Sequence, residues 1–122
     1  MIDPKPVVLV VEDQNWVKTR LERELGGRID FHMTSSPQEA QTQFKKTPKP
    51  KVVVINARLQ MPVSDSVELA EEFKGPFTGI MIGTSGTPYY QDMLEKAGCD
   101  YVCDQDSLIP MLIQILNLQP KD

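Results

Sequence analysis

Several residue types and motifs are scarce in this chain of 122 residues. It holds two cysteines and one histidine, too few for a zinc site, which usually takes four Cys and His ligands at regular spacing. No apolar run approaches the ~20 residues of a membrane-spanning helix, and residues 1–6 lack the charged and then apolar layout of a signal peptide. We therefore expect a soluble, cytoplasmic protein without a membrane partner.

The two cysteines, Cys99 and Cys103, lie at the entrance of a short apolar run and within it. On one strand they would be an even number of residues apart and would face the same side. We expect both to be buried, reduced thiols. The lone His32 is expected to be a strand residue without a chemical role.

Positive charge is also in short supply, since 13 Lys and Arg against 17 Asp and Glu give a net charge of −4. One loose basic cluster of Lys45, Lys46, Lys49 and Lys51 flanks a proline-containing loop, which is typical of a solvated surface. A nucleic-acid-binding domain usually carries a basic patch or stripe. We expect no nucleic-acid partner.

Motifs for nucleotides and other cofactors are missing. The chain has no Gly-x-Gly-x-x-Gly, no Walker-type loop and no Asp-x-His-x-x-Gly cobalamin motif. The hints of a phosphate or flavin loop are limited to Thr84-Ser85-Gly86 and Ser64. A flavodoxin-like protein that binds a small ligand or a metal therefore stays open as an alternative function.

The chain does contain two continuous apolar runs that end in polar residues. Val7–Val11 is followed by Glu12 and Asp13, and the four β-branched residues Val52–Ile55 are followed by Asn56. Such runs predict strands that are buried on both faces. In an open parallel sheet the ligand crevice lies outside the carboxyl ends of the strands. These three polar residues are therefore candidate functional groups.

Periodicity and capping signals predict the remaining elements. Three more strands are expected over residues 29–33, 80–82 and 101–103, and five helices over residues 14–25, 37–46, about 66–74, 88–97 and about 107–118. Ser36 is expected to cap the second helix and Asp65 the third. Asp106 or Ser107 is expected to cap the last helix, which places Pro110 in its first turn.

Strands and helices thus alternate strictly as (βα)5, which predicts an α/β fold with a parallel sheet, helices on both faces and right-handed crossovers. We expect a doubly wound, flavodoxin-like five-stranded sheet with strand order 2-1-3-4-5, in a single domain over residues 1–122. This order sets the first and third strands side by side. Glu12, Asp13 and Asn56 should then meet in one crevice.

Five stretches follow one another at nearly regular positions: Val7–Asp13, Val52–Ile55, Met61–Leu69, Thr84 after Ile80-Met81-Ile82, and Ala97–Val102. In this order they resemble the receiver domain of response regulators from two-component systems, over essentially the whole chain. The resemblance implies phosphorelay signal transduction by protein contact and no enzymatic activity. It implies that Glu12 and Asp13 bind a metal such as Mg²⁺, and that Thr84 and Tyr101 form a switch pair.

The sequence departs from the receiver pattern at the positions that handle phosphate. Asn56 stands where the family has the phosphoacceptor aspartate, and a carboxamide cannot attack a phosphodonor. Asp104 stands in place of the lysine that pairs with the phosphoryl group, and Ser66 in place of a common glycine. We therefore expect a pseudo-receiver that is not controlled by aspartyl phosphorylation. A phosphoreceiver with an unusual acceptor, Asp65, is the alternative.

The departures also leave an acidic pocket of Glu12, Asp13 and Asp104, in which the carboxylates should repel one another unless a cation lies among them. One candidate is a weakly bound divalent cation such as Mg²⁺, held by Glu12 and Asp13. Another is Arg58, which would act as an internal plug. A solvated pocket without a role is the third. No cofactor is required in any of these readings.

The last expected helix is apolar around more than half of its circumference. One stripe suits packing on the sheet, while Ile109, Ile113 and Leu116 lie on an adjoining arc. One sheet cannot cover both arcs, so the excess predicts contact with a protein partner. We expect a kinase, an effector or a second copy of the chain, the last as a homodimer through this helix.

Overall fold

The computed structural model describes residues 5–46, 48–57 and 62–118. Within them, strands and helices alternate along the chain as expected. The strands are β1 (Val7–Val11), β2 (Asp30–Thr34), β3 (Val52–Asn56), β4 (Ile80–Thr84) and β5 (Tyr101–Cys103). The helices are α1 (Asn15–Leu25), α2 (Pro37–Phe44), α3 (Val63–Lys74), α4 (Pro88–Ala97) and α5 (Gln105–Ile115).

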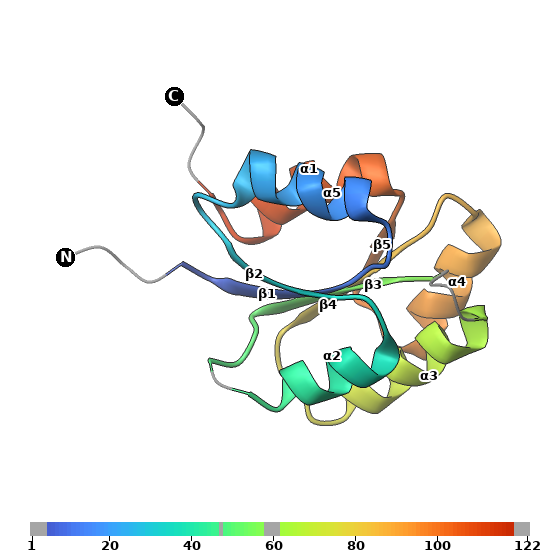
Figure 1. Ribbon diagram of the computed structural model, residues 1–122. Helices are drawn as coiled ribbons and strands as arrows, with labels where there is room; N and C mark the ends of the chain where they lie inside the picture. The colour runs from blue at the N-terminus through green and yellow to red at the C-terminus, as the bar shows by residue number, and fades with distance from the viewer. Residues whose placement is uncertain (1–4, 47, 58–61, 119–122) are drawn as a thin grey trace.

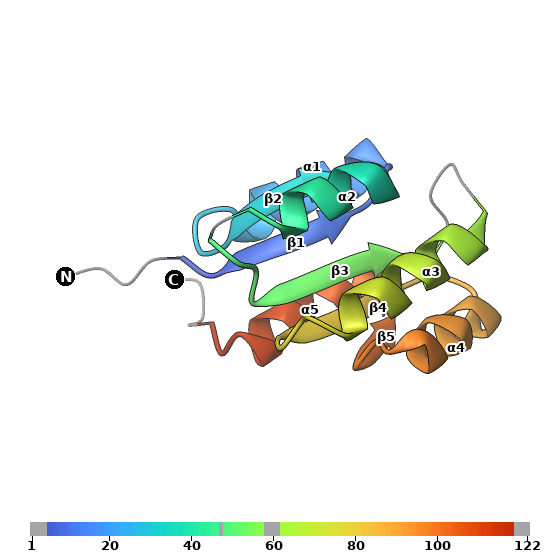
Figure 2. The ribbon, with the colours of Figure 1, turned by 90° about the horizontal axis from the view of Figure 1, so that it is seen from below.

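The sheet has the predicted topology. Its strands are all parallel and run in the order β2-β1-β3-β4-β5. Helices α1 and α5 cover one face, and α2, α3 and α4 cover the other (Figure 1). Turning the molecule shows that β1 and β3 lie side by side and point toward the same end (Figure 2). The two predicted polar strand ends are therefore neighbours in space.

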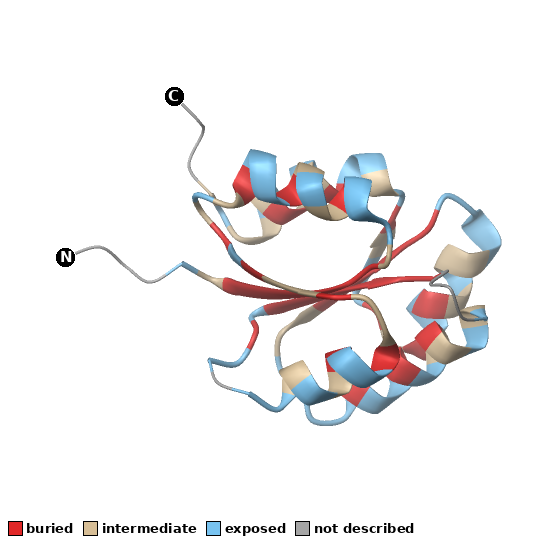
Figure 3. Cartoon of the chain, viewed as in Figure 1, coloured by how far each residue is buried: buried red, intermediate tan, exposed pale blue. Residues whose placement is uncertain are grey.

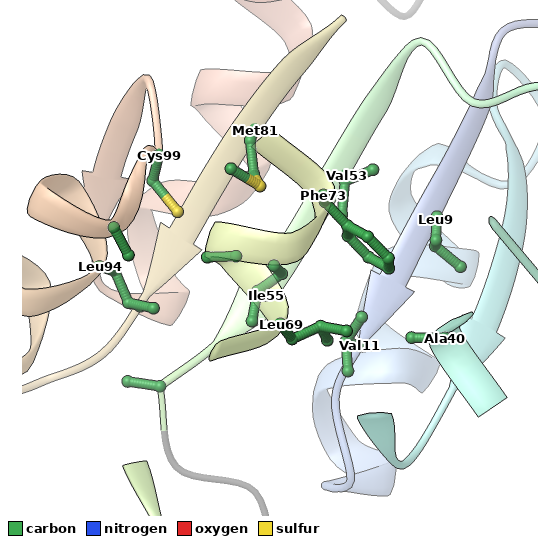
Figure 4. Close-up of a cluster of buried hydrophobic side chains, with 13 residues drawn as sticks. Leu9, Val11, Ala40, Val53, Ile55, Leu69, Phe73, Met81, Leu94 and Cys99 are labelled. Atoms are coloured by element: carbon green, nitrogen blue, oxygen red, sulfur yellow. The ribbon is translucent and has the colours of Figure 1, made fainter. Parts of the chain in front are cut away.

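Strands β1, β3 and β4 contribute to two separate hydrophobic clusters, because successive side chains point to opposite faces of a sheet. In these three strands, odd-numbered positions such as Leu9 and Val53 pack beneath α2, α3 and α4 (Figure 4). Even-numbered positions such as Val10 and Val54 pack beneath α1 and α5. The sheet is consequently buried between two helical layers, with exposed residues on the outer surfaces of the helices (Figure 3).

Two of the helix caps differ from the predicted ones. Helix α3 begins at Val63, with Pro62 as its N-cap, so Asp65 lies in the first turn and does not cap the helix. Helix α5 begins at Gln105, with Asp104 rather than Asp106 or Ser107 as its N-cap. Pro110 therefore lies inside α5 and not in its first turn. The predicted cap of α2 is confirmed, since Ser36 accepts a hydrogen bond from the Glu39 backbone N–H.

Both cysteines are free and buried, as predicted. Their placement on one side of one strand was wrong. Cys99 precedes β5 and packs in the cluster beneath α2, α3 and α4, whereas Cys103 ends β5 and packs in the cluster beneath α1 and α5. The chain turns into the strand between them, so the alternation rule does not extend back to Cys99. Among the described residues, no helix is long and apolar enough to cross a membrane.

Candidate functional site at the carboxyl ends of β1 and β3

Strand register places Glu12 directly beside Asn56. The parallel pairing of β1 with β3 ends at Val11 and Ile55, so the next residue on each chain is Glu12 and Asn56. Both follow the even-numbered alternation and fall on the face covered by α1 and α5. Their side chains therefore meet at the carboxyl edge of the sheet.

The two side chains are joined by a hydrogen bond. Asn56 Nδ2 donates to Glu12 Oε2 over 2.7 Å, and the Gln14 backbone N–H donates to the same oxygen over 3.2 Å. Only 2% of Glu12 and 3% of Asn56 is exposed. Burial raises the pKa of the Glu12 carboxyl above its usual value, and the hydrogen bond from Asn56 opposes that rise. Asn56 thus stabilises the ionised form of a buried acid.

The backbone around Asn56 is also fixed. The buried hydroxyl of Ser66, on α3, donates to the Asn56 carbonyl oxygen over 2.8 Å. The next residue, Ala57, donates its N–H to the Thr84 carbonyl over 2.8 Å. Asn56 is therefore held through its side chain by β1, through its carbonyl by α3, and through the following residue by β4.

Asp13 differs from Glu12, although the two are adjacent in sequence. Its Oδ1 atom is buried and has no hydrogen-bond partner among the described residues. A buried acceptor without a partner is costly, and more so when it carries charge. This oxygen is the point of the site where a cationic group would be most favourable. The predicted plug, Arg58, lies outside the described residues.

The third predicted acid does not join the pair. Asp104 is exposed, and its Oδ1 accepts the Ser107 backbone N–H over 2.8 Å at the start of α5. The described part of the chain contains no group of three His, Cys, Asp or Glu side chains that could hold a metal ion. Of the three predicted acids, Glu12 and Asp13 therefore lie at the end of β1, while Asp104 belongs to the cap of a helix.

The resemblance to receivers implies a divalent cation at Glu12 and Asp13, which the donor set allows us to test. Mg²⁺ requires oxygen ligands in near-octahedral geometry. Glu12 Oε2 already accepts two N–H groups, one of them from Asn56. An N–H donor thus occupies the place where a third carboxylate would face the ion, and Asp13 Oδ1 is a buried oxygen without a partner among the described residues. As arranged, these residues do not fit a divalent-cation centre.

The two predicted switch residues lie apart along their strands. Thr84 ends β4, is 1% exposed, and pairs with Cys103 in the register of β4 and β5. Tyr101 begins β5, pairs with Ile82, and is 47% exposed. Thr84 is therefore part of the buried edge beside Asn56, its register partner on β3, whereas Tyr101 is part of the surface.

The predicted interface residues border the hydrophobic cluster beneath α1 and α5. Ile109, Ile113 and Leu116 are half-buried and pack against the cluster beneath α1 and α5. They share one helical stripe with Asp106, at spacings of three and four residues. Asp106 Oδ1 pairs with Arg20 Nη1 of α1 at 3.0 Å. The stripe therefore runs along the seam between α1 and α5.

A hollow beside α5 was not predicted from the sequence. Met111 and Ile115 are half-buried and, with Gln114 and Tyr101, line a hollow of about 240 Å³. The signal that could have found it is the edge position of β5, which leaves one side of α5 without a neighbouring helix. The hydrogen bond between Asn56 and Glu12 was also missed, although strand register alone would have indicated it.

The amino-acid sequence matches no family model and no curated protein. Solved structures do match the fold. A signal receiver domain of an HD domain-containing protein from Pseudomonas fluorescens Pf-5 has a TM-score of 0.79 at 17% identity, covering 96% of this chain and 90% of that one. A two-component response regulator from Clostridium difficile has a TM-score of 0.77 at 13% identity, covering 96% of this chain and 100% of that one.

The BeF3-activated N-terminal receiver domain of Klebsiella pneumoniae RstA has a TM-score of 0.75 at 19% identity, covering 90% of this chain and 97% of that one. The chain thus has the flavodoxin-like fold of response-regulator receiver domains, as predicted. Because these three identities lie between 13% and 19%, the likeness is one of fold.

Proposed function

We propose that this protein is a receiver-like signalling module that acts by protein contact and is not switched by aspartyl phosphorylation. One observation carries the proposal. The residue at the acceptor position, Asn56, has a carboxamide in place of a carboxylate, and its Nδ2 is bonded to the buried Glu12. The side chain is therefore neither a nucleophile nor exposed to a phosphodonor. In this proposal the module is not an enzyme and needs no cofactor.

The alternative acceptor, Asp65, lies in a different environment. It sits in the first turn of α3 and lines a groove of about 260 Å³ between α2 and α3, together with Glu68 and Glu72. The neighbouring carboxylates would repel an incoming phosphodonor. Asn56, by contrast, falls on the face covered by α1 and α5. This placement supports the view that Asp65 does not substitute for the missing aspartate.

The test is incubation with acetyl phosphate followed by intact mass spectrometry. We expect no gain of a phosphoryl group under conditions that label a phosphorylatable receiver domain run in parallel. A phosphoryl gain that disappears in Asp65→Ala would show that Asp65 is the acceptor. A gain that persists in that variant would show another acceptor, and either result would contradict the proposal.

The partner surface that we propose lies at the edge of the sheet, where Tyr101 meets Met111 and Ile115 of α5. These side chains line one hollow, and Tyr101 is 47% exposed. Exposed aromatic and methionine side chains are enriched where proteins associate. In the proposed arrangement a second copy of the chain covers this surface and forms a homodimer through α5.

A further inference from the structure

We propose that the Asn56 carboxamide is a built-in replacement for a cation, so that this edge of the sheet folds and stays in one state without metal. The inference rests on the proposed function, in which the site is not a phosphorylation site. It goes beyond the proposed function by giving Asn56 a structural role of its own. Asn56 is here a positioning residue that holds the Glu12 carboxylate.

Glu12 carries a carboxylate that is almost fully buried. An ionised carboxylate that is 2% exposed requires a hydrogen-bond donor or a cation. The structure supplies two donors, the Asn56 Nδ2 at 2.7 Å and the Gln14 N–H at 3.2 Å. The shorter bond comes from a side chain that is itself 3% exposed. Asn56 therefore satisfies Glu12 from within the chain.

The other two positions that depart from the receiver pattern, Ser66 and Asp104, also make hydrogen bonds within the chain. Ser66 Oγ donates to the Asn56 carbonyl oxygen at 2.8 Å, which fixes the backbone that carries the amide. Asp104 accepts the Ser107 N–H at 2.8 Å, so its charge is used at the start of α5. Each departing residue thus makes a hydrogen bond within the chain. The polar groups of these residues therefore have partners within the chain, whereas the buried Asp13 Oδ1 has none among the described residues.

An aspartate at position 56 would change the charge balance of the site. In Asn56→Asp a carboxylate would face the Glu12 carboxylate at hydrogen-bond distance, in a buried place. Two like charges there destabilise the fold unless a cation lies between them. A hard divalent cation then gains the third carboxylate that the wild-type site lacks. One substitution should therefore convert a metal-independent domain into a metal-dependent one.

The experiment is thermal unfolding of the full chain in EDTA and in millimolar Mg²⁺. The wild type should unfold at the same temperature in both, within about 1 °C. Asn56→Asp should unfold about 5 °C or more below the wild type in EDTA and recover most of that loss in Mg²⁺. Asn56→Ala, the matched control, should lose stability in EDTA and gain none in Mg²⁺, because it removes the hydrogen bond without adding a charge.

Three outcomes would overturn the inference: a wild type that Mg²⁺ stabilises, an Asn56→Asp variant that is as stable as the wild type in EDTA, and an Asn56→Asp variant that Mg²⁺ does not rescue, including one that stays unfolded in both buffers. None of these outcomes depends on phosphorylation. A phosphoryl gain in the wild type would defeat the proposed function while leaving the metal response of Asn56→Asp to be read separately.

Discussion

Burial on opposite faces of the sheet protects the two thiols of this chain. Burial raises the pKa of Cys99 to about 12 and that of Cys103 to about 11. The thiolate is the reactive form, so both should resist iodoacetamide at about pH 8.5, where a free thiol is half ionised. We expect no alkylation of the native protein and two modifications after unfolding in urea, as measured by intact mass. Rapid native labelling would contradict the buried placement.

The same shifts predict how stability depends on pH. A thiol whose pKa is raised in the folded state loses its proton first in the unfolded state, near pH ~8.5. Its contribution is therefore complete below that pH and is lost as the pH rises toward about 11 for Cys103 and about 12 for Cys99. The wild type should lose more unfolding free energy between those limits than the Cys99→Ala/Cys103→Ala variant. If the unfolding free energies of the two proteins fell in parallel as the pH rises, the raised pKa of the two thiols would be contradicted.

The site shows what single residues in a sequence can and cannot reveal. The meeting of Glu12 with Asn56 could be predicted, because both follow buried strands whose order is fixed by topology. The fate of Asp104 could not, because an acid at a strand end can face the crevice or cap the next helix. In the structure Asp104 caps the helix, because it accepts a hydrogen bond from the Ser107 backbone N–H. A local hydrogen bond of this kind leaves no trace in hydrophobic patterning.

At the scale of elements, helix α5 depends on its N-cap. Asp104→Ala removes the acceptor of the Ser107 N–H and should lower the unfolding free energy by about 1 kcal/mol. Asp106→Ala is the matched control, because it removes an acid two residues away that makes a largely exposed ion pair with Arg20. That change should cost less than about 0.5 kcal/mol. Urea unfolding measures both, and equal losses would contradict the cap.

Helix α3 is anchored by an aromatic stack. Phe73 is 2% exposed, and its ring lies on that of Phe44 of α2 with centroids 4.2 Å apart. Phe73→Ala should lower the unfolding free energy by about 3–5 kcal/mol, from lost burial and the cavity left behind. Phe44→Ala should cost less, because Phe44 is only half-buried. Urea unfolding tests the ranking, and a smaller loss for Phe73→Ala would reverse it.

Element types were easier to predict than helix starts. The run Val52–Ile55 predicts a buried strand, because β-branched residues favour sheets and no polar residue interrupts the run. The start of α3 had two competing signals. Asp65 could cap a helix, but Pro62 could precede one directly, and the structure begins α3 at Val63. Boundaries remain ambiguous when several residues could end the same helix.

At the scale of the whole molecule, topology follows from alternation. Parallel strands joined by helices cross over right-handedly, so five βα units have few ways to close, and the predicted order was confirmed. The outer surface follows from no such rule. Tyr101 of the edge strand β5 lines a hollow with Met111 and Ile115 of α5, and Asp106 of the same helix pairs with Arg20 of α1. Periodicity alone predicted a partner surface on Ile109, Ile113 and Leu116, whereas the surface that we propose includes Met111 and Ile115.

The proposed homodimer gives a test at this scale. Tyr101→Glu places a charge in the hollow lined by Met111 and Ile115, where a second copy would exclude water. Association should therefore require a concentration at least ~10-fold higher than in the wild type, because a charge buried without a partner costs more than 1.4 kcal/mol. Thr42→Glu is the matched control, since it adds the same charge at an exposed position of α2, on the other face of the sheet (Figure 1).

Sedimentation velocity over a concentration series measures the mass of the species, and circular dichroism checks that both variants stay folded. The wild type and Thr42→Glu should associate alike while Tyr101→Glu stays monomeric to higher concentration, and a wild type that is monomeric throughout would refute the homodimer.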